Sequence, residues 1–243
     1  MNGMFEQIVF KTEARGKLQL PLKEYGRSVL GCPLLYIPCK GACRLLVVAG
    51  IHGEESETTF LLSRCLRAFE TIFDHTAFVL CANPDGMTLG TRGNANGVDL
   101  NRNFSTTNWK PQTVLSRSVI ESNRDTALFS GECAESEPET QCLVRLMENL
   151  SPQTILSIHA PLACIDAPEK TRLVHTLCSA FHLPWIPDIG YPTPGSLGTW
   201  CKERSKKQNP IDCITLELPR MSLEALFDRY ASSFTNWLVQ PLE

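Results

Sequence analysis

Apolar runs alternate with helix-like segments along most of this chain. Short apolar runs predict four strands, at residues 44–50, 76–84, 154–160 and 213–218. Apolar positions at helical spacing predict four helices, at residues 56–73, 136–152, 169–181 and 222–239. Alternation of this kind favours an α/β sheet with helices on both faces. We expect residues 1–243 to form a single domain.

Local signals predict how two of these elements begin or end. Asn83-Pro84-Asp85-Gly86 predicts a turn after the second strand. Ser136, with Glu139 three residues later, predicts a capping box at the start of the helix at 136–152. Residues 86–132 are polar and show little periodicity. Because long irregular segments in compact domains are often functional, this stretch is a candidate for part of a site.

Composition and charge exclude several classes of protein. The 243 residues are 43% hydrophobic and 20% charged, and the net charge is −3, so we expect no binding to nucleic acid or to an anionic membrane. Residues 1–21 lack the apolar block of a secretory signal, and no apolar run is long enough to span a bilayer. The 11 cysteines are scattered without a CxxC pair, which favours free thiols and a cytoplasmic location.

Three signals with ionisable side chains are associated with predicted strands. His52 and Glu55 follow the first strand, His159 lies near the end of the third, and Glu217 lies within an otherwise apolar strand. Ligands gather at the carboxyl ends of strands in open α/β sheets, and a buried carboxylate is costly unless it is paired or faces a site. Each position also has an ordinary explanation. His52 could be a solvated loop histidine and Glu55 a glutamate at a helix start. His159 could be a hydrogen-bonded core histidine, and Glu217 could be the partner of a buried arginine.

A fourth signal is the polar segment 83–104, which contains Arg92, Arg102 and several amides. The planar guanidinium group of arginine suits carboxylates and oxyanions because it makes two parallel hydrogen bonds. The alternative is a solvated loop with ordinary charges.

The order of these signals is more specific than any one of them. In order, the chain has HxxE after a strand, NPDG, an arginine, GVDLNRNF (97–104), a strand ending in histidine and a strand carrying glutamate. This order closely resembles that of the M14-type zinc carboxypeptidases. The resemblance runs from about Tyr25 to Glu217. It implies a mixed, mostly parallel twisted sheet with helices on both faces. It also implies one zinc ion per chain, bound by His52, Glu55 and His159.

The same resemblance implies roles for residues around the metal. Asp99 would orient His52, and Arg92 would stabilise the oxyanion. Asn101 and Arg102 would hold the terminal carboxylate of the substrate.

Two further positions correspond to catalytic residues of the family. Glu217 would act as general base and general acid. Tyr191 precedes Gly195-Ser196 much as the mobile tyrosine of the family precedes its Gly-Ser, although the spacing differs by one residue. The alternative for Tyr191 is a rim aromatic that packs and does not react.

Stretches outside the metal motif narrow the resemblance to a bacterial cytoplasmic branch of the family. They are YGRSVLGCPL (25–34), GNANGVDLNRNF (93–104), SGECAESEPET (130–140), HAPLACI (159–165) and GYPTPGSLGTWC (190–201). That branch cleaves the γ-D-glutamyl–meso-diaminopimelate bond of murein tripeptide in peptidoglycan recycling. We therefore expect a small peptide substrate, L-Ala-γ-D-Glu-meso-diaminopimelate, and a monomer or homodimer.

Two other functions share parts of this pattern. An aspartoacylase-like N-acyl amino acid deacylase would use the same ligands and Glu217, but that group usually lacks the full GVDLNRNF block and adds a β-rich tail. A catalytically silent peptide-binding module is the second alternative, because a fold alone does not guarantee an activity. Activity on N-acyl amino acids tests the first alternative, and zinc content tests the second.

Overall fold

The computed structural model describes residues 16–111, 114–117, 125–204 and 210–240. Its strands are β1 (Lys23–Arg27), β2 (Pro33–Ile37), β3 (Leu45–Val48), β4 (Thr76–Val79), β5 (Val114–Arg117), β6 (Asp125–Leu128), β7 (Thr154–His159), β8 (Leu162–Asp166), β9 (Trp185–Ile186) and β10 (Asp212–Pro219). Its helices are α1 (Ser56–Leu66), α2 (Pro84–Leu89), the 3₁₀ turn η1 (Leu100–Arg102), α3 (Pro138–Leu150), α4 (Arg172–Phe181), α5 (Leu197–Arg204) and α6 (Leu223–Leu238).

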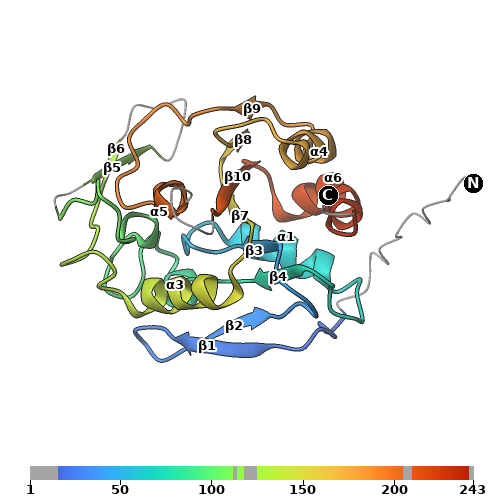
Figure 1. Cartoon of the computed structure of the whole chain (residues 1–243), viewed down its shortest axis with the longest axis horizontal. Coiled ribbons are helices and arrows are strands. Elements are labelled where there is room, and N and C mark those ends of the chain that lie inside the picture. The colour runs from blue at the N-terminus through green and yellow to red at the C-terminus, as the bar shows by residue number, and fades with distance from the viewer. Residues whose placement is uncertain (1–15, 112–113, 118–124, 205–209, 241–243) are drawn as a thin grey trace, which may run out of the picture.

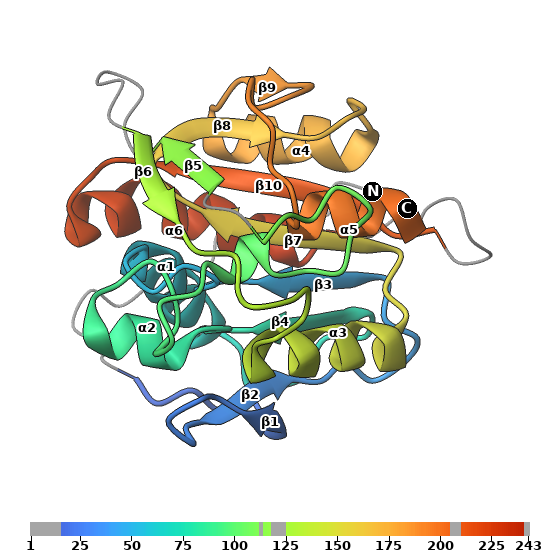
Figure 2. The same cartoon turned by 90° about the vertical axis from the view of Figure 1, so that its left-hand side faces the viewer.

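One large sheet organises the described residues. Its strand order is β1-β2-β4-β3-β7-β10-β8-β9, and β5 and β6 form a separate hairpin. The four central strands β4, β3, β7 and β10 run parallel to one another, and β9 runs parallel to β8. The β1–β2, β2–β4 and β10–β8 pairs are antiparallel. Figure 2 shows these strands one above another. The expected mixed, mostly parallel sheet is confirmed.

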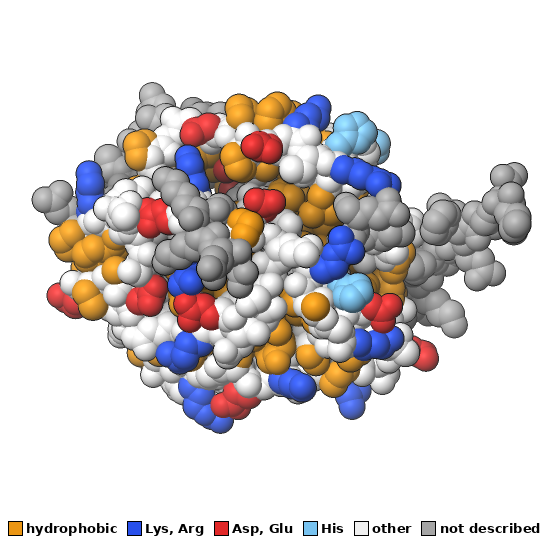
Figure 3. Space-filling view, viewed as in Figure 1, with side chains coloured by type: hydrophobic (Ala, Val, Ile, Leu, Met, Phe, Trp, Pro, Cys, Tyr) orange, Lys and Arg blue, Asp and Glu red, His pale blue; other side chains and the backbone are white. Residues whose placement is uncertain are grey.

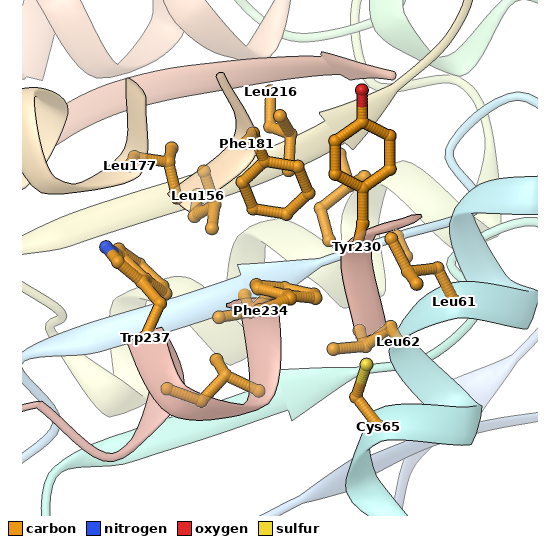
Figure 4. Packing of buried hydrophobic residues seen from close by; sticks show 14 of the residues in the cluster. Leu61, Leu62, Cys65, Leu156, Leu177, Phe181, Leu216, Tyr230, Phe234 and Trp237 are labelled. Carbon is orange, nitrogen blue, oxygen red and sulfur yellow. The ribbon is translucent and has the colours of Figure 1, made fainter. Parts of the chain in front are cut away.

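Helices cover both faces of this sheet, as the sequence predicts. Helices α1, α4 and α6 lie on one side, and α3 and α5 lie on the other (Figure 1). On the first side, Phe181, Phe234 and Trp237 pack with Leu61 and Leu156 in a continuous apolar cluster (Figure 4). A second cluster lies under α3 and α5. The central strands are therefore buried on both faces, which explains their uninterrupted apolar sequences.

The predicted turn at Asn83-Pro84-Asp85-Gly86 is wrong, because these residues begin helix α2. Asn83 is the N-cap, and its side chain accepts a hydrogen bond from Gly86 N at 2.9 Å. Pro84 occupies the first turn, where the missing N–H has no cost. Gly90 ends the helix in the left-handed conformation.

The predicted capping box at Ser136 is also wrong. Pro138 opens α3, so the N-cap is Glu137, and no side chain caps the helix. Ser136 Oγ instead donates to Glu137 Oε1 at 2.6 Å. Glu139 accepts hydrogen bonds from Val29 N at 3.0 Å and from the Asn94 side chain at 3.0 Å. These polar side chains connect the start of α3 to distant loops.

The helix predicted at 56–73 is shorter than expected and ends at Leu66. Two i→i+3 bonds follow it, from Ala68 N to Cys65 O and from Phe69 N to Leu66 O. Such bonds tighten the chain at helix ends. Phe69 and Phe73 still pack against the core, which accounts for the helix-like apolar spacing beyond Leu66.

The remaining sequence expectations concern charge, cysteines and membrane spans. All 11 cysteines are free thiols, as expected. In the face shown in Figure 3, basic and acidic side chains are interspersed, without a large field of one sign. Within the described ranges, no helix has the length and apolar character needed to cross a membrane.

Candidate metal centre and active site

His52 and Glu55 lie in the corner between β3 and α1. Gly50 turns the chain there with φ +64°, a conformation that favours glycine. Thr58 fixes the corner, because its hydroxyl donates to Glu55 O at 2.8 Å and accepts from Gly50 N at 3.1 Å. Both site residues are buried, with exposed fractions of 2% for His52 and 6% for Glu55. The short HxxE motif is therefore held rigidly inside the protein.

His159 meets this pair because β7 lies beside β3 and runs parallel to it. His52 Nδ1 lies 2.7 Å from Glu55 Oε1, and His159 Nδ1 lies 3.1 Å from Glu55 Oε2. The two Nδ1 atoms are 3.2 Å apart. One ligand atom from each of the three residues lies within 4.8 Å of the others. The structure thus brings together the three residues that the sequence pattern singles out.

The outward-facing ring nitrogens have their own partners. His52 Nε2 lies 3.2 Å from Asp99 Oδ1, and His159 Nε2 lies 2.9 Å from Ser157 Oγ. Metal-binding histidines usually donate their second N–H to such a group, which fixes the tautomer. Two imidazoles and one carboxylate are a donor set that zinc prefers in catalytic sites. The site therefore fits zinc both in its three ligand residues and in the groups, Asp99 and Ser157, that contact the second ring nitrogens of the histidines.

The charges of the triad depend on one another. Burial alone would raise the pKa of Glu55, but the adjacent His52 and His159 outweigh it and hold that pKa below its ordinary value. Burial and Arg92 act to lower the pKa of His52, yet Glu55 and Asp99 raise it overall. Burial lowers the pKa of His159. An ionised carboxylate beside a neutral His159 suits a bound cation.

Asp99 connects the triad to Arg92. Its side chain accepts from Arg92 Nε at 2.9 Å and from Asn101 N at 2.8 Å. Although burial opposes ionisation, Arg92 and His52 hold the pKa of Asp99 well below its usual value. Arg92 Nη1 also lies 3.4 Å from Glu55 Oε1. The guanidinium group is therefore positioned directly beside the triad.

Asn101 and Arg102 lie in η1, immediately after Asp99. Arg102 is 2% exposed, its Nη1 donates to Asn101 O at 2.8 Å, and its Nε has no hydrogen-bond partner in the described structure. Asn101 Oδ1 accepts from Leu197 N at 2.9 Å. At Gly195, with φ +72°, a Cβ would lie 2.2 Å from Arg102 O. The segment before α5 therefore packs against the backbone of the arginine block.

Glu217 lies beside His159, because β10 pairs in parallel with β7 at that position. The carboxylate is only 6% exposed and accepts a hydrogen bond from Leu162 N at 3.3 Å. Burial, and then the negative charge of Glu55, raise the pKa of Glu217 to about 8. A carboxyl group with such a pKa can take up and release a proton near neutral pH.

These residues open onto one cavity of about 940 Å³. Its lining includes the triad, Glu217, Arg92, Asn101, Arg102 and Tyr191. Asp99 contacts His52 Nε2 and does not line the cavity. The other histidines, His75, His175 and His182, are exposed and lie elsewhere, as expected. Sequence reasoning missed Ser157, although its position two residues before His159 places both side chains on one face of β7.

Comparison with known proteins defines the class of this fold and site. Residues 22–165 match the family model described as zinc carboxypeptidase. The chain therefore belongs to the zinc carboxypeptidase family. It is similar to Murein peptide amidase A of Escherichia coli (strain K12), with 41% identity over 227 residues, or 92% of each chain.

Solved structures agree with this assignment. The crystal structure of the murein-tripeptide amidase from Escherichia coli O157 matches with a TM-score of 0.86 and 38% identity, covering 94% of this chain and 96% of the other. Carboxypeptidase A from Helicoverpa armigera shares the fold at 19% identity, with a TM-score of 0.64 over 90% of this chain and 66% of its own.

Proposed function

We propose that this protein is a zinc-dependent amidase that hydrolyses the γ-D-glutamyl–meso-diaminopimelate bond of murein tripeptide. The observation that carries the proposal is the meeting of His52, Glu55 and His159 with buried Glu217 at the wall of one cavity. The similarity to Murein peptide amidase A and to a murein-tripeptide amidase supports the substrate.

His52 and His159, through Nδ1, and Glu55, through its carboxylate, are the proposed zinc ligands. When bound, zinc supplies Lewis acidity, which polarises the scissile carbonyl and favours ionisation of water. Asp99 and Ser157 hold the two imidazole rings in the orientation that points Nδ1 inward.

Glu217 is the proposed proton carrier. As a carboxylate it accepts a proton from the attacking water at one of its oxygens. It then donates that proton to the nitrogen of the leaving amine. Leu162 N holds the carboxylate in place. This reversal of roles suits a group whose pKa is raised by burial.

The arginines contribute charge to opposite ends of the scissile unit. Arg92, beside Glu55, is the proposed donor to the oxyanion that develops on the carbonyl oxygen. Asn101 and Arg102 are the proposed partners of the carboxylate of diaminopimelate next to the scissile bond. Arg102 is buried, and among the described residues its Nε has no hydrogen-bond partner, so this N–H remains available to an anion. Tyr191 lines the same cavity and is proposed to close over the substrate.

A reducing compartment is the proposed location. The 11 free cysteines support it, since several approach one another without being joined. Cys213, for example, interacts with Cys201, and Cys39 interacts with Cys43. This location agrees with a substrate that is a small recycled peptide, and we propose the cytoplasm.

The test is incubation of the zinc-loaded protein with L-Ala-γ-D-Glu-meso-diaminopimelate, followed by mass spectrometry of the products. We expect free diaminopimelate and L-Ala-D-Glu, no reaction after removal of zinc by a chelator, and recovery when zinc is restored. Glu217→Gln should bind zinc but lose activity by about 10²–10⁴-fold. Glu70→Gln, at an exposed position that does not line the cavity, should remain active. Hydrolysis of N-acyl amino acids in place of the tripeptide would refute the proposed substrate.

A further inference from the structure

The cavity continues beyond the triad along the face of β10 and β8. In this antiparallel pair, Glu217 lies opposite Cys164, and Thr215 lies opposite Asp166. Alternate residues of a strand share a face, and directly opposed residues point to the same side. Asp166 therefore lies on the Glu217 side of the sheet, about 7 Å from Glu217 along the strands, toward the amino end of β10. Asp166, Thr215 and Glu217 all line the cavity.

A second carboxylate faces this part of the cavity. Asp188, in the loop after β9, also lines it, and its negative charge acts on Asp166. Neither carboxylate forms an ion pair with a lysine or arginine within the described ranges. Burial, and then the charge of Asp188, raise the pKa of Asp166 to about 6. Two neighbouring acids with no cation of their own favour a positively charged ligand group.

We propose that Asp166, assisted by Asp188, is the subsite for the distal ammonium group of the substrate's diaminopimelate residue. This inference rests on the proposed function, because it places the scissile bond at Glu217. In an extended diaminopimelate side chain, the distal nitrogen lies about 6 Å from the α-carbon, given C–C bonds of about 1.5 Å. That reach matches the distance along the sheet from Glu217 to Asp166.

The subsite gives the enzyme a basis for choosing its substrate. Asn101 and Arg102 would engage the carboxylate beside the scissile bond, which every peptide with a free C-terminus has. Asp166 would engage a group that a plain aliphatic residue lacks. A polar site that pairs with one substrate group rejects analogues without that group, because its own charge is left unsatisfied.

The experiment compares two peptides and three proteins. The peptides are L-Ala-γ-D-Glu-meso-diaminopimelate and an analogue with L-2-aminopimelate at its C-terminus, which lacks only the distal amine. The proteins are the zinc-loaded wild type, Asp166→Asn, and the control Asp228→Asn, whose exposed residue on α6 does not line the cavity. The measurement is kcat/KM for each combination, with zinc content and thermal unfolding as checks.

We expect the wild type to prefer the diaminopimelate peptide by about 10- to 100-fold, the range of one charged hydrogen bond. Asp166→Asn should lose that preference by losing activity on diaminopimelate alone, and Asp228→Asn should keep it. An equal fall on both peptides, or an unchanged preference in Asp166→Asn, would overturn the subsite while leaving the proposed function standing. Failure of the wild type to cleave either peptide would instead overturn the proposed function.

Discussion

Replacing Glu217 by glutamine should stabilise the metal-free protein at alkaline pH. The carboxylate is 6% exposed and lies near Glu55, and among the described residues it accepts a single hydrogen bond, from Leu162 N. Burial, and then the charge of Glu55, raise its pKa from an ordinary 4.5 to about 8. Because one pKa unit corresponds to about 1.4 kcal/mol, ionising Glu217 costs the metal-free fold at most about 5 kcal/mol. Glutamine keeps the shape and the acceptor but carries no charge.

The sign of the effect follows from proton binding. Between pH 4.5 and 8 the folded state holds a proton on Glu217 that the unfolded state has released. The wild type therefore loses stability as pH rises through this window, and the loss is complete above the folded pKa. Glu217→Gln lacks this loss. The difference in unfolding free energy should be near zero below about pH 4.5 and largest above about pH 8. Bound zinc should shrink the difference, because a cation favours the carboxylate.

Urea unfolding of both metal-free proteins, followed by circular dichroism across this pH range, measures the difference. Glu70→Gln, at an exposed position, serves as the matched control and should show no pH-dependent gain. A difference that does not change with pH, or a mutant less stable than the wild type at about pH 9, would refute the electrostatic reasoning. The expected result would show that the fold holds the proposed proton carrier at the expense of its own stability.

Three other substitutions test separate parts of the structure. Asp99→Asn removes the carboxylate beside His52 Nε2 and should weaken zinc binding by about 10- to 100-fold in competition with a chelator; equal affinity would contradict its orienting role. Gly195→Ala brings a Cβ within 2.2 Å of Arg102 O, so kcat/KM should fall by about 10- to 100-fold at unchanged zinc content. Full activity would show that the backbone moves apart without disturbing the site. Phe234→Ala opens a cavity in the core and should lower the unfolding free energy by about 3–5 kcal/mol in urea; a loss under about 1 kcal/mol would mean that the core refills the space.

The centre of the fold was predictable because β3, β7 and β10 are buried and give short apolar runs. The outer strands were not. The pattern of β1 is mostly exposed or half-buried, and β9 has only two residues, so neither gives a usable periodicity. Helix α5 was missed for a related reason. Only three of its residues are buried, and its apolar positions do not form a clear stripe.

The site was predictable only as a combination of signals. His52 and Glu55 alone had an ordinary explanation, and the order of all four signals gave the family. The structure adds what no local pattern contains. The Leu162 N–H at Glu217 and the opposition of Asp166 to Thr215 both depend on β8 pairing with β10. Because the sequence did not predict β8, it could not predict either of these contacts.

Close backbone contacts explain how distant segments form one rigid site. A Cβ at Gly53, between the first two proposed ligands, would lie 2.0 Å from the Gly86 carbonyl carbon. A Cβ at Gly195 would meet Arg102 O in the same way. The ligand corner is thus packed against the start of α2, and the wall of the cavity against the arginine block. Side chains at these two glycines would separate the segments, so the geometry of the site depends as much on missing side chains as on the ones that do chemistry.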